Sequence, residues 1–208
     1  MGPFKRIGRW LRGWHDDQTG SMPIEGIMGF LLMIGWFMVA FQFYDAFRLK
    51  SVNAKAAYTV ADMVSREKAP IGPAYVQGMQ KVFDFVTNSR GRSWIRVTSI
   101  RWDDDLKKYR VEYSHASKSG IASYTDSTLN DQAWRIPIMP VGDTAIIVET
   151  SMRYTPIFAG TENELAIGGT DGSGNKLFTR IGLNDSIRFS NFVVTRPRGP
   201  RIVWNDSY

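Results

Sequence analysis

Cysteine is absent from this chain of 208 residues, and histidine occurs only twice. The missing cysteines exclude disulfides, thiolate nucleophiles and cysteine-ligated zinc sites. His15 lies near the start of the chain and His115 in a predicted strand, so no histidine-based triad or zinc cluster can be assembled. We therefore expect a protein that is not an enzyme, with no catalytic residues, no metal and no cofactor.

A strong excess of one charge is missing as well. The chain has 26 basic and 20 acidic residues, and its net charge of +6 is too small to indicate a nucleic-acid footprint. Basic and aromatic residues do not interleave as they do on protein surfaces that bind single-stranded nucleic acid. Arg196, Arg198 and Arg201 cluster near the C-terminus, and we interpret them as charges that guard an exposed strand edge. The composition predicts no nucleic-acid partner.

Long apolar runs are missing too, with a single exception at residues 26–44. This run has no charged residue and is close in length to the roughly 20 residues that cross a hydrocarbon core as a helix. It predicts one membrane span. Residues 1–20 are short and mostly basic, and such a flank is easily retained in the cytoplasm, whereas long domains are translocated largely regardless of charge. We expect a cytoplasmic basic leader over residues 1–20 and an extracytoplasmic domain over residues 73–208.

A basic start followed by an apolar stretch is also typical of a secretory signal peptide. Here the apolar run is longer than the usual core of roughly 7 to 15 residues, and no A-x-A cleavage site follows it. The chain continues as Asp45-Ala46-Phe47-Arg48, which offers an ordinary signal peptidase little to cut. The run is therefore predicted to remain as an anchor.

The residues in front of the run carry a specific pattern. Gly20 is followed five positions later by Glu25, which opens the apolar helix. The chain resembles type IV pilin-like precursors, whose leaders end in glycine and whose mature chains carry glutamate at position five. Roughly residues 14–50 resemble the TadE and TadG pseudopilins of the tight adherence (Tad, Flp pilus) machinery, and residues 137–158 are loosely similar to the strands of such proteins. The chain departs from the family at Gly26, where an aromatic residue is usual.

This resemblance implies a minor pseudopilin that helps to initiate or build a Flp-type pilus. A prepilin-type peptidase would cut between Gly20 and Ser21. The Glu25 carboxylate would then meet the new N-terminal amine of a neighbouring subunit and fix the register of assembly. The implied partners are membrane lipid, that peptidase, other pilins and pseudopilins, and Tad envelope components. The implied location is the bacterial inner membrane, with a single span and a periplasmic or extracellular C-terminal domain.

Two other interpretations stay open. The chain could be an uncleaved bitopic anchor that displays a periplasmic protein-interaction domain. It could also be a membrane-tethered enzyme, if a carboxylate pair such as Glu149 with Asp143, or Glu162 with Glu164, formed a site.

Helical periodicity continues beyond the span as far as the proline and glycine breaker at residues 69–73. It predicts one helix over residues 21–68, about 48 residues and about 72 Å long. Because this length exceeds a bilayer, the C-terminal half must pack on the soluble domain or on partners. The apolar residues that fall at helical spacing in this half are Phe47, Val52, Ala56, Val60, Met63 and Val64.

The rest of the chain predicts a small mixed domain. A second helix is expected over residues 73–89, with Val76, Met79, Val82, Phe83 and Val86 on one face. Strands are expected over residues 94–102, 108–114, 144–154 and 186–195, and a short helix over residues 128–135 with Ser127 as its cap. The turn at Asp103, Asp104 and Asp105 is interpreted as a solvated hairpin turn in preference to a cation site. The predicted fold class is α+β: a long N-terminal helix, transmembrane in its first half, then a small antiparallel sheet with a second helix.

Overall fold

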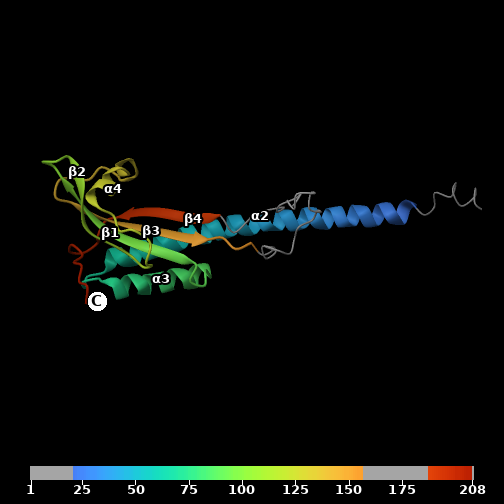
Figure 1. Ribbon diagram of the computed structural model, residues 1–208, viewed down its shortest axis with the longest axis horizontal. Coiled ribbons are helices and arrows are strands. Elements are labelled where there is room, and N and C mark those ends of the chain that lie inside the picture. Colours follow the sequence, from blue (N-terminus) through green and yellow to red (C-terminus); the bar gives the residue numbers. More distant parts are fainter. Residues whose placement is uncertain (1–20, 157–186, 208) are drawn as a thin grey trace, which may run out of the picture. The chain divides into compact units, whose positions relative to one another are not determined.

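A computed structural model describes residues 21–156 and 187–207 of the chain. The fold is α+β, with helices and one antiparallel sheet, as predicted (Figure 1). The chain divides after Phe43 into two compact units, the second of which begins at Tyr44. Within the described residues, the second unit holds all of the strands.

The long helix α2 covers Ser21–Arg66 without interruption. It ends two residues before the predicted boundary, because the Glu67 side chain accepts hydrogen bonds from the backbone N–H groups of Lys68 and Ala69 and so turns the chain out of the helix. The backbone then pairs with the C-terminal segment. Ile71 donates its N–H to the carbonyl of Val203 at 2.9 Å.

The part of α2 that belongs to the second unit packs on the sheet through small side chains. Its buried apolar residues are Ala56, Ala57, Val60, Ala61 and Val64. Two of the apolar residues at helical spacing do not pack on the sheet, since Phe47 is 67% exposed and Met63 is also exposed. The face that packs begins instead with the buried polar residues Asp45 and Asn53, so a pattern based on apolar residues placed its first turns on the wrong side.

Helix α3 covers Pro73–Thr87 and lies on the same face of the sheet. Pro73 occupies the first turn, where its missing N–H costs nothing. Val76, Met79 and Phe83 are buried as predicted, whereas Val86 is exposed. The helix ends at Asn88, whose left-handed conformation (φ 52°) is one that asparagine adopts readily.

The sheet has four antiparallel strands in the order β2-β1-β3-β4. The strands cover Ser93–Asp103 (β1), Lys108–Ala116 (β2), Thr144–Arg153 (β3) and Arg188–Thr195 (β4). All four were predicted, with ends that differ by at most two residues. The register of the hairpin shifts between Ser99 and Ile100, where Ser99 pairs with Tyr113 and Ile100 with Val111. Glu112 is therefore the extra residue of a β-bulge.

The connection between β2 and β3 contains two short helical segments, α4 (Asp126–Asn130) and the 3-10 turn Ala133–Arg135. The predicted helix over residues 128–135 was therefore placed too late, and its predicted cap was wrong. Thr125 caps α4, because its hydroxyl accepts from the backbone N–H of Thr128, whose own hydroxyl accepts from the N–H of Thr125 in return.

Each face of the sheet has its own apolar core. The α2 and α3 side buries residues that include Ile95, Val97, Ile146 and Val148. The opposite face is covered by the connection between β2 and β3, which contributes Tyr124, Leu129, Ile136 and Met139. The sheet is therefore an inner layer, and the central strand β3 is buried along nearly its whole length.

Candidate membrane and assembly site

The first part of α2 is apolar and exposed. Among the described residues, α2 is the one helix that is long and apolar enough to cross a membrane, and it lies near the N-terminus. Large side chains such as Leu32, Trp36 and Phe37 are exposed, Trp36 by 75%. In water this surface would be unfavourable by roughly 25 cal/mol for each Å² of apolar area. Such a segment is long and apolar enough to cross a membrane.

The predicted site residues lie at the start of this helix. Gly20 lies outside the described residues, and Ser21 is the first residue of α2. Glu25 is exposed on the helix. It follows the first turn, which contains no acidic residue. The Glu25 carboxylate is open to a partner from outside the chain.

At the start of the second unit, α2 carries buried polar residues whose burial the sequence pattern did not predict. Asp45 is buried, and its carboxylate lies 3.8 Å from the Arg48 guanidinium. Tyr154, at the end of β3, is fully buried, and this burial raises the pKa of its phenol. The Asp45 carboxylate adds to the rise. Buried acidic residues on a helix face give no hydrophobic signal, which is why the pattern missed them.

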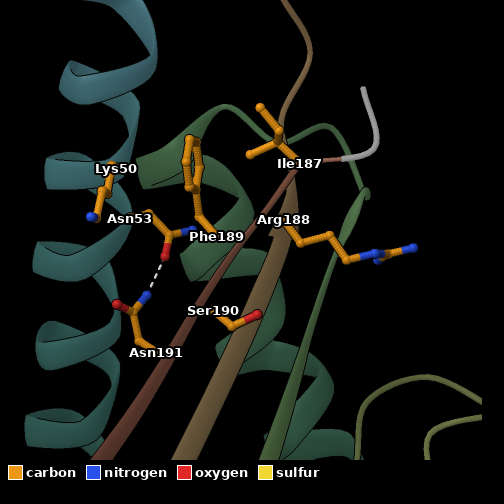
Figure 2. Close-up of a pocket in the computed structure, with 7 residues that line it drawn as sticks. All are labelled: Lys50, Asn53, Ile187, Arg188, Phe189, Ser190 and Asn191. Atoms are coloured by element: carbon orange, nitrogen blue, oxygen red, sulfur yellow. Dashed lines mark hydrogen bonds between the residues drawn. The ribbon is translucent and has the colours of Figure 1, made fainter. Parts of the chain in front are cut away.

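A shallow pocket lies between α2 and β4 (Figure 2). It has a volume of about 230 Å³, with Ile187 and Phe189 on its apolar side. Asn53 of α2 is fully buried and accepts a hydrogen bond from the Asn191 amide, which also donates to the Thr150 hydroxyl at 3.3 Å. Lys50 and Arg188 also line this pocket. They come from its two sides, and their charged ends point away from one another (Figure 2).

On the opposite face, Arg96 and Glu149 form an ion pair across β1 and β3, where they are direct partners in the register. Their side chains are only 13% and 10% exposed. The Tyr124 ring lies 3.7 Å from the guanidinium carbon of Arg96, and its hydroxyl donates to Glu149 at 2.9 Å. Burial raises the pKa of Tyr124, and the neighbouring Glu149 carboxylate adds to the rise. This cluster attaches the connection between β2 and β3 to the sheet that it covers.

The three arginines near the C-terminus follow β4, an edge strand of the sheet. Each makes an ion pair with an acidic residue of another element. The pairs are Arg196 with Asp143 at 3.1 Å, Arg198 with Asp62 at 2.8 Å and Arg201 with Glu112 at 2.8 Å. These contacts hold the C-terminal segment against α2, the β-bulge and the start of β3.

The acidic turn between β1 and β2 is held together by its own groups. The Asp103 carboxylate accepts from the N–H groups of Asp105 and Leu106 and from the Arg110 guanidinium. These contacts lower the pKa of Asp103, the Leu106 hydrogen bond most strongly. Residues 21–156 and 187–207 contain no group of three or more histidine, cysteine or acidic side chains placed to hold a metal ion.

The carboxylate pairs considered from the sequence are not brought together where they are described. Glu149 lies within β3 and is paired with Arg96, whereas Asp143 precedes β3 and is paired with Arg196. Glu162 and Glu164 lie outside the described residues.

Comparison with known proteins gives no relative. No family model matches the chain, and neither a curated protein nor a solved structure matches it.

Proposed function

We propose that this protein is a TadE-like minor pseudopilin, inserted in the bacterial inner membrane with its C-terminal domain on the outer side. It helps to initiate or build a Flp-type pilus and is processed after Gly20. One observation carries the proposal. A single unbroken helix, Ser21–Arg66, is apolar and exposed in its first part and built into a β-sheet domain in its last part.

Such a helix gives the subunit two functions at once. The exposed apolar part can lie in lipid before assembly and against other subunits afterwards, because both surroundings remove it from water. The sheet domain holds the C-terminal part of the helix through Ala56, Ala57 and Val60 and is presented away from the lipid. Among the partners of this proposal are membrane lipid, a prepilin-type peptidase and the other pilins and pseudopilins.

Glu25 has the role of an assembly residue. It is the one acidic residue in the exposed apolar part of α2, and its exposed carboxylate is available to an amine from another chain. An apolar surrounding makes an unpaired carboxylate costly, so the pair would select the correct register between subunits. Cleavage after Gly20 would create that amine at Ser21 of the next subunit.

The alternative is an uncleaved bitopic anchor with a periplasmic protein-interaction domain. It uses the same helix and the same domain, so the fold is equally compatible with it. Two properties distinguish the functions. The pseudopilin is cleaved after Gly20 and needs Glu25 for assembly, whereas the anchor keeps its N-terminus and does not need Glu25. The described residues do not form a carboxylate pair that would support an enzymatic function.

Substitution of Glu25 tests assembly directly. We expect Glu25→Ala to reach the membrane at the level of the native protein but to lower the yield of sheared pili by at least about tenfold, since loss of one partner strands a buried charge. The matched control is Asp105→Ala, which removes an exposed acidic side chain in the hairpin turn. Normal pilus yield from the Glu25 variant would contradict the assembly role.

A further inference from the structure

Basic residues gather at one end of the second unit, which we call the basic end. It contains Arg48, Lys50, Arg90, Arg92, Lys118, Arg153 and Arg188. Contacts between the elements at this end bring these residues close to one another. Lys50 and Arg188 line the same pocket, Arg153 is the register partner of Arg188, and Arg153 donates its N–H to the carbonyl of Arg92 at 3.3 Å. The Lys118 ammonium donates to the carbonyl of Gly91.

This end is also where α2 enters the unit, at Tyr44. Figure 1 shows the end of β3, the start of β4 and the turn between α3 and β1 at one end of the sheet. The exposed rings of Tyr44 and Phe47 lie on the first turns of this part of α2, just before Arg48 and Lys50. Amphipathic aromatic side chains such as tyrosine are enriched at membrane boundaries.

Within the described residues, Arg48 is the one member of the basic end that makes an ion pair with an acidic side chain. Asp45 is buried beside Arg48, and the Asp84 carboxylate accepts from the hydroxyls of Ser89 and Ser93. The acidic turn and the ion pairs of the C-terminal arginines belong to the other end of the sheet. The unit is therefore polarised in charge along its strands.

Two of these arginines lie where their charges are unfavourable for the stability of the fold. Arg153 and Arg188 are direct partners across β3 and β4, both are exposed, and neither makes an ion pair with any described residue. Like charges directly opposite one another destabilise a sheet. An anionic ligand on this surface would remove the repulsion and turn the pair into a binding feature.

We propose that the basic end binds the phosphate groups of anionic phospholipids and so holds the domain against the membrane surface. The inference depends on the proposed placement of α2 in the membrane. Lipid is favoured over an acidic protein because the basic end adjoins the residue at which the apolar run stops, where headgroups are present at high local concentration. Each lysine or arginine near an anionic surface adds attraction that falls off within a Debye length.

The test uses the full chain in nanodiscs that contain either neutral lipid or lipid with about a third of anionic phosphatidylglycerol. Because the chain has no cysteine, a single donor dye can be attached at Ser119→Cys, beside Lys118, with an acceptor on the lipid headgroups. We expect energy transfer to be at least twofold higher in anionic nanodiscs, and the difference to disappear in high salt.

Paired variants separate lipid binding from folding. The double variant R153Q/R188Q should lose most of the anionic enhancement without a lower melting temperature, because it also removes the like-charge pair. The control R101Q/K108Q removes two exposed basic residues from the other end of the same sheet and should keep the enhancement.

Equal transfer in neutral and anionic nanodiscs, from protein that is inserted, would overturn the lipid proposal and leave an acidic protein as the partner of the basic end. Failure of the chain to remain with either nanodisc after washing at high pH would instead contradict the membrane placement of α2, and the lipid proposal with it.

Discussion

The ion pair between Arg96 and Glu149 is the residue-scale contact on which the covering of the sheet most depends. Both side chains are nearly buried, and Glu149 also accepts from Tyr124. We expect Glu149→Ala to lower the free energy of unfolding by about 3 to 5 kcal/mol, because it leaves the Arg96 charge buried without its partner. Urea unfolding in detergent, followed by tryptophan fluorescence, measures the change.

The matched control for that substitution is Asp143→Ala. Asp143 pairs with Arg196, but the two side chains are 31% and 60% exposed, so the pair is worth no more than about 1 kcal/mol. Equal losses from the two substitutions would show that burial does not set the strength of the Arg96 pair.

The sequence draws attention to a single residue where its neighbours in the chain form a pattern around it. Gly20 and Glu25 stand out because they precede a long apolar run, whereas Arg96 and Glu149 lie far apart in sequence and meet only through the strand register. Asp45 and Asn53 were missed for another reason. They are buried by contacts in the folded unit, and a hydrophobic pattern assigns polar residues to solvent.

At the scale of elements, α4 closes one edge of the sheet. The Asn130 side chain accepts from the N–H of Tyr109 at 3.0 Å and donates to its carbonyl at 2.8 Å, and the Asp126 carboxylate accepts from the N–H of Val111 at 2.7 Å. These side chains take the place of a further strand beside β2. An edge without such partners is a template for pairing with another chain.

We expect Asn130→Ala to expose this edge, to lower the free energy of unfolding by about 1 to 2 kcal/mol and to promote self-association. Light scattering coupled to size exclusion in detergent measures the association. Asp131→Ala, at the next and exposed position, should leave the protein as it was. Unchanged association of the Asn130 variant would mean that the edge is protected by something other than α4.

Element boundaries followed from local chemistry that the sequence displays. Proline and glycine at residues 69–73 separate α2 from α3, and the alternation of apolar residues located the strands to within two positions. The short helix was misplaced because Thr125 and Ser127 are both acceptable caps, and only the reciprocal bond with Thr128 decides between them. Which side of α2 faces the sheet depends on tertiary contacts, so the local sequence could not predict it.

At the scale of the whole molecule, the α+β fold was predictable because each element has a strong local signal and the chain alternates little between helix and strand. The charge distribution of the second unit was not. Its basic residues are scattered from Arg48 to Arg188 in the sequence and come to one end of the unit only when the ends of three strands and two helices meet.

The central claim is that the chain enters the membrane through α2 and is cut between Gly20 and Ser21. The most direct measurement is the intact mass and N-terminal sequence of the native protein recovered from the membrane fraction. The account predicts a chain that begins at Ser21, and a Gly20→Leu variant that keeps its first twenty residues. A native protein that starts at Met1 and is recovered from the soluble fraction would contradict it.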